Sequence, residues 1–203
     1  MKPFLLTLAL AFSASACIRL PHVPPEPRAP QVQRLTDVRV TSSCSGDTDD
    51  PWSSDGSAAG VIVSERHVLT AAHVVRCPAL PTVRVYLRDG TMFRMVVERD
   101  DAMFPRGAGS DIARLEIASA ERFGLNVPPP ELGLTDGGMT VCLPQGCART
   151  SFYETNFVEI ESKPGDSGTG VYDPDGRLLG LVVSTRGGWT RIEPVGAYWL
   201  EGT

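Results

Sequence analysis

From residue 37 onward, short β-branched or alternating runs are separated by glycine, proline and aspartate, which limits the chain to a fold of short strands. The 203 residues include 20 glycines and 17 prolines, too many breaks for long helices. Strands at this spacing indicate an all-β sandwich or barrel and not βαβ units. The expected strands are Asp37–Thr41, Ala58–Ser64, His67–Thr70, Val83–Leu87, Thr91–Glu98, Ile112–Ile117, Met139–Leu143, Thr150–Ile160, Gly170–Tyr172, Leu178–Ser184 and Thr190–Val195.

Composition narrows the class of protein further. Hydrophobic residues make up 42% of the chain, enough for a substantial core, so the chain as a whole is not disordered. The net charge of −5 offers no basic face for a nucleic-acid partner.

The first 16 residues have the pattern of a signal peptide. A lysine at position 2 precedes the apolar run FLLTLALAF, which is too short to span a bilayer, and small residues follow it. These small residues lead directly into Cys17, as in a bacterial lipobox, although Ala14 stands where that motif has leucine. We therefore expect export and a lipid on Cys17.

Residues 17–36 form the expected anchor cysteine and tether. Five prolines lie between residues 21 and 30, and proline at this density favours an extended conformation over a sheet interior. With Cys17 assigned to lipid, four cysteines remain, an even set that suits an oxidising compartment. They allow three pairings, of which chain order favours Cys44–Cys77 and Cys142–Cys147. Zinc is the alternative, but no CxxC pair or ligand-spaced histidine accompanies them.

Three segments carry residues suited to acyl-transfer chemistry: TAAHVV with His73, SDIARLEI with Asp111, and PGDSGTGV with Ser167. A serine hydroxyl becomes a good nucleophile when a histidine takes its proton, and a carboxylate fixes the histidine tautomer. Taken singly, His73 could be a core histidine, Asp111 a turn residue and Ser167 part of an ordinary turn. Together, in the order His, Asp, Ser, they favour a triad.

These three segments resemble the signature segments of the trypsin/chymotrypsin-like serine peptidases, over roughly residues 40–203. The resemblance implies two packed antiparallel β-barrels, residues 37–126 and 127–203, with the active site between them. It implies His73 as general base, Asp111 as its orienting carboxylate and Ser167 as nucleophile. It also implies an oxyanion hole made by the backbone N–H groups of Gly165 and Ser167, and Ser184 on the strand that pairs with substrate.

Several departures from the family pattern concern the second half of the chain. Only 56 residues separate Asp111 from Ser167, so the second barrel is expected to be shortened. No Ile-Val-Gly-Gly terminus is present to pair with Asp166, and Arg149 is the expected substitute cation. Glu161, six residues before Ser167, stands where trypsin-like enzymes carry a pocket carboxylate, which would favour Lys or Arg in the substrate; alternatively, it points into solvent.

The sequence thus predicts an exported serine endopeptidase, monomeric, without cofactor or metal, that acts on protein or peptide substrates. Its expected location is the bacterial cell envelope, in the periplasm or attached to the outer membrane through lipid on Cys17, or outside the cell as a secreted protein. Two alternatives remain. One is a catalytically silent barrel pair that binds peptides, and the other is an esterase on another fold, which would need a GxSxG elbow that the chain lacks around Ser167.

Overall fold

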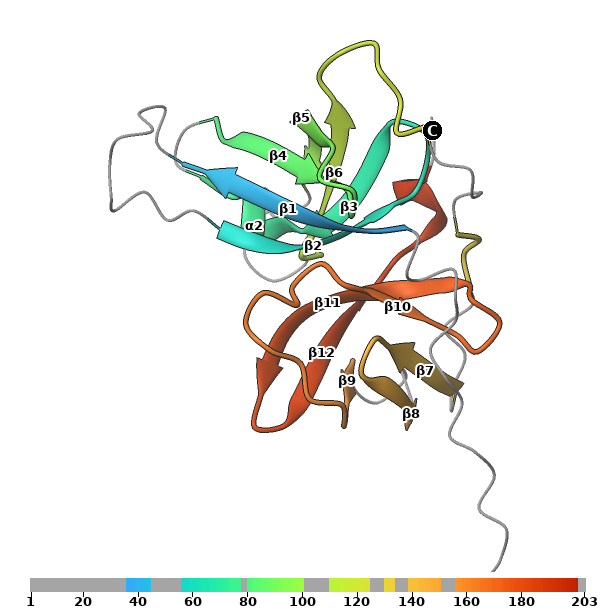
Figure 1. The fold of residues 1–203 in the computed structure, drawn as a ribbon. Coiled ribbons are helices and arrows are strands. Elements are labelled where there is room, and N and C mark those ends of the chain that lie inside the picture. Colours follow the sequence, from blue (N-terminus) through green and yellow to red (C-terminus); the bar gives the residue numbers. More distant parts are fainter. Residues whose placement is uncertain are drawn as a thin grey trace, which may run out of the picture.

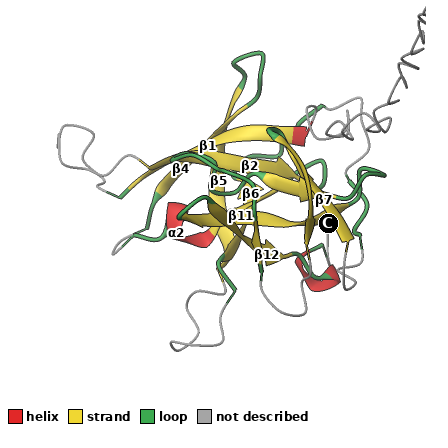
Figure 2. Ribbon diagram, turned by 90° about the horizontal axis from the view of Figure 1, so that it is seen from below, coloured by secondary structure: helices red, strands yellow, loops and turns green. Residues whose placement is uncertain are grey.

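Two antiparallel β-barrels are stacked on one another in the computed structural model, one from each half of the chain (Figure 1). The structure describes residues 36–44, 56–77, 80–100, 110–124, 130–133, 139–150 and 156–200. The expected signal peptide, the tether as far as residue 35 and Cys17 lie outside these ranges. Figure 2 shows that helix within the described part is confined to short turns at the margins of the strands.

The first barrel is closed and has the strand order β1-β2-β3-β6-β5-β4. Alternating side chains from its strands fill the interior, with Val40, Val68, Val85 and Leu115 fully buried. Alternation suits a sheet with one face inward, which explains why its strands could be read from the sequence. Its strands are β1 (Asp37–Ser43), β2 (Gly56–Ile62), β3 (His67–Ala71), β4 (Thr82–Tyr86), β5 (Met92–Asp100) and β6 (Ile112–Ile117).

The second barrel is nearly closed and also has six strands, in the order β8-β7-β10-β11-β12-β9. The shortening expected from the sequence lies in the length of its strands, since β9 has two residues and β10 has three. Its strands are β7 (Met139–Leu143), β8 (Gly146–Thr150), β9 (Phe157–Val158), β10 (Gly170–Tyr172), β11 (Leu178–Arg186) and β12 (Trp189–Pro194).

The expected strand Thr150–Ile160 differs from the structure where the chain is described. β7 turns back at Pro144 and Gln145 into β8, which ends at Thr150. Residues 151–155 lie outside the described ranges. Beyond them, β9 pairs with β12 over Phe157 and Val158 and ends short of Ile160.

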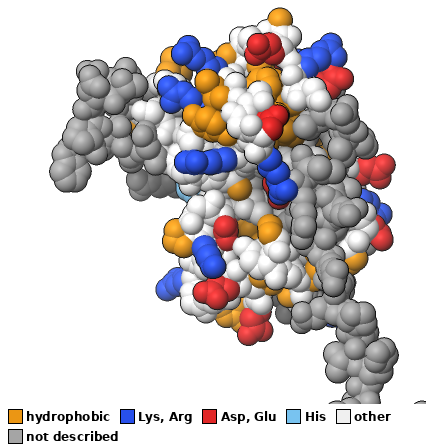
Figure 3. Space-filling view, viewed as in Figure 1, with side chains coloured by type: hydrophobic (Ala, Val, Ile, Leu, Met, Phe, Trp, Pro, Cys, Tyr) orange, Lys and Arg blue, Asp and Glu red, His pale blue; other side chains and the backbone are white. Residues whose placement is uncertain are grey.

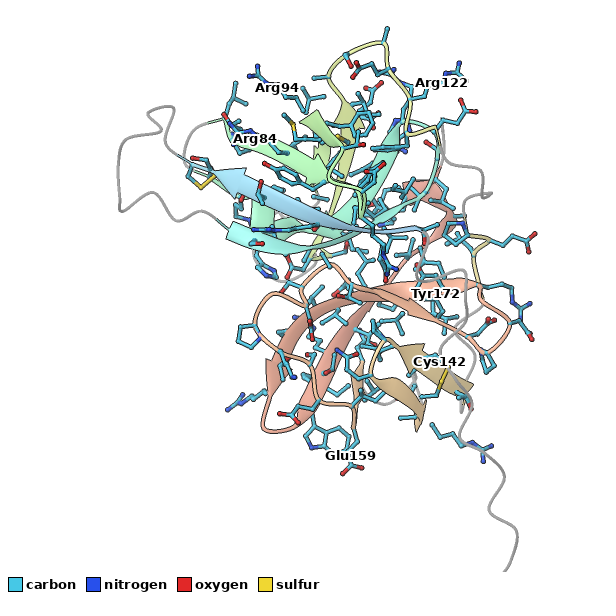
Figure 4. The ribbon with its side chains drawn as sticks, viewed as in Figure 1. Arg84, Arg94, Arg122, Cys142, Glu159 and Tyr172 are labelled. Atoms are coloured by element: carbon cyan, nitrogen blue, oxygen red, sulfur yellow. A yellow bond between two sulfur atoms is a disulfide. The ribbon has the colours of Figure 1, made fainter. Side chains whose placement is uncertain are left out.

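An apolar cluster lies between the barrels. Val61 and Leu69 of the first barrel pack with Tyr172 and Leu181 of the second, and Trp199 joins them. The Tyr172 hydroxyl, labelled in Figure 4, lies 3.2 Å from the Thr36 hydroxyl at the start of β1. This cluster makes the two barrels one packed unit.

The chain returns to the first barrel at its end. A short 3₁₀ turn, η2 (Ala197–Trp199), follows the second barrel, and the Trp199 carbonyl accepts a hydrogen bond of 3.1 Å from Arg114 on β6. Arg114 is buried and also donates to both carboxylate oxygens of Glu98 on β5, at 2.7 and 2.9 Å. This guanidinium therefore joins β5, β6 and the C-terminal turn.

Two disulfides are present, Cys44–Cys77 and Cys142–Cys147, so both favoured pairings are confirmed. The first links the end of β1 to the segment after α2 (Ala72–Val75), and the second joins directly opposed residues of β7 and β8 (Figure 4). Disulfides indicate an oxidising, exported environment. Within the described residues, no helix has the length and apolar character needed to cross a membrane. On the face shown in Figure 3, basic and acidic side chains are interspersed.

Candidate active site

His73 lies in the single helical turn α2, which follows directly after β3. All five residues of β3 are buried, and the small buried residues Ala71 and Ala72 allow the chain to turn sharply at the barrel wall. The Ala72 N–H donates to the Asp111 carbonyl at 3.0 Å, which anchors this turn against the start of β6. As a result the imidazole stands at the surface, with 43% of the side chain exposed.

Asp111 holds His73 by two hydrogen bonds. Its Oδ1 accepts from the His73 backbone N–H at 2.9 Å, and its Oδ2 lies 2.9 Å from the ring Nδ1. A carboxylate can only accept, so this contact places the ring proton on Nδ1 and leaves Nε2 as an acceptor. His73 Nε2 lies 3.1 Å from the Ser167 hydroxyl, so the geometry suits proton transfer from Ser167 to His73.

The loop that carries Ser167 is hydrogen-bonded to both barrels. The Ser167 carbonyl accepts from the Ala59 N–H of β2 at 2.8 Å, and the Gly168 N–H donates to the Val182 carbonyl of β11 at 2.7 Å. Gly168 has a φ of 83°, and a Cβ at this position would lie 2.1 Å from the Ala59 carbonyl oxygen. Only glycine can bring the loop this close to β2.

Gly165 and Ser167 present backbone donors beside the hydroxyl. Gly165 has a φ of 98°, a conformation that favours glycine. In the described part of the chain, neither the Gly165 N–H nor the Ser167 N–H has a hydrogen-bond acceptor. Two such donors next to a nucleophile can stabilise a developing oxyanion.

The expectation that Arg149 pairs with Asp166 is wrong. Asp166 Oδ2 accepts from the Gln145 side-chain amide at 3.0 Å and from the Lys163 backbone N–H at 2.7 Å. Arg149 is exposed on β8, and the structure shows no ion pair between it and Asp166. Because Asp166 is only half-buried, neutral donors and solvent suffice for its charge.

Glu193 on β12 is a residue that the sequence analysis missed. Its carboxylate pairs with Arg191 at 3.1 Å, and only 13% of its side chain is exposed. Burial raises the pKa of Glu193; the Arg191 charge opposes this shift, and the nearby charge of Asp111 adds to it. The sequence predicted the strand that carries Glu193, but no neighbouring residue in the sequence indicated that Glu193 lies near Asp111.

Two cavities flank Ser167, of about 320 and 370 Å³. The first also contacts His73, Arg76, Gly165 and Cys44 of the first disulfide. The second contacts Ser167 but not His73. It is lined by Ser162, Lys163, Pro164, Val182, Ser184 and Thr185.

The structure brings Ser184 to the second cavity but not Glu161. Ser184 is exposed on β11, just beyond an irregularity in its pairing with β12. Glu161 is exposed and does not line the cavity, so the pocket role expected for it is wrong. It is the next residue, Ser162, that is buried at the cavity, because the two side chains alternate across the extended segment.

Across the described ranges, no group of three His, Cys, Asp or Glu side chains is arranged to hold a metal ion. The site is therefore composed of hydroxyl, imidazole, carboxylate and backbone amide groups.

Comparisons with known proteins agree on the fold. No protein-family model matches the chain, and no curated protein matches it. Among solved structures, 673 chains match. One is described as "Crystal structure of Rv3671c protease, inactive form" and is 18% identical, with a TM-score of 0.56, over 81% of this chain and 85% of that one. At this identity the likeness shows the fold alone, a pair of packed antiparallel β-barrels.

Proposed function

We propose that this protein is a serine endopeptidase that hydrolyses peptide bonds through an acyl-enzyme intermediate. The observation that carries the proposal is the unbroken series of contacts from Asp111 through His73 to Ser167. It is supported by the cavities on both sides of Ser167 and by the protease-like fold.

In the proposed mechanism, Ser167 Oγ attacks the carbonyl carbon of the scissile bond while His73 Nε2 takes its proton. The carbonyl oxygen becomes an oxyanion within reach of the Gly165 and Ser167 N–H groups. His73 then gives the proton to the leaving amine, and the C–N bond breaks to leave an ester on Ser167. A water molecule, deprotonated by His73, attacks the ester and restores the Ser167 hydroxyl.

A fluorophosphonate probe tests this function without knowledge of the substrate. The probe reacts with serine hydroxyls that are activated by a base, so wild-type protein should be labelled on Ser167. Ser167→Ala and His73→Ala should lose labelling, by at least about a thousandfold in rate. Ser119→Ala, which removes an exposed hydroxyl on the first barrel, is the matched control and should react like the wild type.

Labelling of Ser167→Ala at the wild-type rate would contradict the assignment. A folded protein that the probe does not label and that cleaves no peptide would favour the alternative of a silent peptide-binding module. The esterase hypothesis required a nucleophile elbow between a strand and a helix, and an all-β fold does not supply one.

The proposal extends to location and partners. The protein is exported to a bacterial envelope, held there by lipid on Cys17, and acts as a monomer on protein or peptide substrates. Cys17→Ser should move the protein from the membrane fraction to the soluble fraction. The measurement is membrane fractionation together with the mass of the N-terminal peptide. An unmodified N-terminus on soluble wild-type protein would contradict lipidation.

A further inference from the structure

The second cavity lies where the substrate residue that acylates Ser167 would place its side chain. In the proposed mechanism, which this inference rests on, His73 gives its proton to the leaving amine, so the leaving half of the substrate lies on the His73 side. The cavity of about 320 Å³ contacts both His73 and Ser167, and the one of about 370 Å³ contacts Ser167 without His73. The second cavity therefore receives the side chain of the residue whose carbonyl is attacked.

Besides Ser167 and Ser184, which also line this cavity, three hydroxyl groups form a hydrogen-bonded cluster at it. Ser162 and Thr185 line it, and their hydroxyl oxygens are in hydrogen-bond contact with each other. Thr190 is buried behind Ser162 and is within reach of two acceptors, the Ser162 oxygen at 2.9 Å and the Ile160 carbonyl.

The hydrogen bonds of this cluster leave two hydroxyl groups able to turn toward a substrate. The three hydroxyl groups carry three protons and make three contacts, Thr190 with the Ile160 carbonyl and Ser162 with both Thr190 and Thr185. Neither Ser162 nor Thr185 has another acceptor in the part of the chain that the structure describes. Because both line the cavity, either hydroxyl can rotate out of the contact between them and donate to an acceptor that enters.

The charge at the cavity has the matching sign. Lys163 is the charged residue among those that line it, and no described carboxylate does so. Glu161 is exposed outside the lining, and Asp166 is occupied by Gln145 and the Lys163 N–H. A hydroxyl group that can rotate toward the cavity, beside an ammonium group, is a setting in which a carboxylate gains charge-assisted hydrogen bonds.

We propose that this cavity selects an acidic side chain, glutamate or aspartate, in the residue that contributes the attacked carbonyl. Lys163 supplies the charge and the Ser162–Thr185 pair supplies the hydrogen bond. This preference is the opposite of the one expected from Glu161, and it follows from Ser162 standing at the cavity in place of Glu161.

The test uses matched peptides that differ only in the residue before the cut: Glu, Gln, Lys or Leu. We expect kcat/KM for Glu to exceed that for its isostere Gln by at least about tenfold, because the ion and the hydrogen bond both act on the carboxylate. Equal or faster cleavage after Gln, Lys or Leu would overturn the proposal.

Two variants assign the preference to its residues. Ser162→Ala should lower the Glu-to-Gln ratio by about tenfold. Lys163→Met should lower it by about threefold, and more at low ionic strength, since its ammonium is exposed and screened. Arg186→Met removes an exposed cation of β11 that does not line the cavity, and it should leave the ratio unchanged. Because Ser162 is buried, Lys163→Met is the variant that keeps the test decisive if Ser162→Ala does not fold.

The fluorophosphonate probe separates the two proposals. Labelling of Ser167 together with cleavage after neutral or basic residues would overturn the acidic preference alone. Absence of both labelling and cleavage would overturn the proposed function and this inference with it.

Discussion

At the scale of single residues, Gly168 sets how closely the Ser167 loop approaches β2. Gly168→Ala would place a methyl group 2.1 Å from the Ala59 carbonyl oxygen at a φ of 83°. We expect a loss of stability of about 3 kcal/mol or more, from strain and forced displacement. Displacement of Ser167 should also lower the proposed peptidase activity by about a hundredfold. Both are measured on the same preparation, by urea denaturation and by peptide cleavage.

Gly90→Ala is the matched control for this prediction. Gly90 has a φ of 89°, close to that of Gly168, but no atom lies within 4 Å of its added Cβ. This variant should lose only about 1 kcal/mol and keep its activity. Equal effects from the two variants would show that the close approach to β2 does not matter.

At the scale of elements, Arg114 joins β5, β6 and the C-terminal turn. Arg114→Met keeps the length of the side chain but removes the partner of Glu98 and one donor to the Trp199 carbonyl. Without the buried guanidinium, the charge of Glu98 is poorly compensated. We therefore expect the free energy of unfolding to fall by about 2–4 kcal/mol. Arg122→Met is the control, because its ion pair with Glu65 is two-thirds exposed and should contribute less than about 1 kcal/mol. Thermal unfolding of both variants gives the comparison, and similar losses would contradict a role for burial.

The elements also show what could be predicted from the sequence. The strands Ile112–Ile117 and Met139–Leu143 were predicted with the correct bounds because their runs of apolar and β-branched residues are local in the sequence. The β7–β8 hairpin was missed although Pro144 stands at its turn, because the strand expected after Leu143 was begun only at Thr150. The expectations for Glu161 and Asp166 failed for another reason. Which side of an extended segment faces a cavity, and which donor reaches a carboxylate, depend on residues distant in the chain.

At the scale of the whole molecule, Asp37 makes the stability of the barrel pair depend on pH. Its Oδ1 is buried without a hydrogen-bond partner in the described residues, and it lies near Tyr172, whose pKa is raised by burial and then by the Asp37 charge. Burial raises the pKa of Asp37 to about 7, against an opposing effect of Arg88. Between the unfolded value of 3.8 and about 7, the folded state keeps a proton that the unfolded chain releases. The contribution of Asp37 to the free energy of unfolding is therefore complete below about pH 3.8, decreases as the pH rises from 3.8 to about 7, and changes no further above that.

Asp37→Asn should remove this penalty. The variant should match wild type near pH 4 and exceed it at pH 8 by about 2–4 kcal/mol in the free energy of unfolding. Urea denaturation at both pH values measures the difference. Asp89→Asn alters an exposed carboxylate whose pKa is lowered by hydrogen bonds to Thr91, and it should show no such gain at high pH. A pH-independent difference for Asp37→Asn would contradict the assigned cause.

The two hydrogen bonds made by the peptide group between Ser167 and Gly168 have a kinetic consequence. The Ser167 carbonyl is bound to β2 and the next amide to β11, so any fluctuation that separates the barrels breaks one of these bonds and displaces the hydroxyl from His73. The reacting groups therefore cannot separate while the fold stays intact, and activity is lost only when the fold is lost. Heat or denaturant should inactivate the protein at the rate of global unfolding, and a preparation would consist of fully active and fully inactive molecules with none in between.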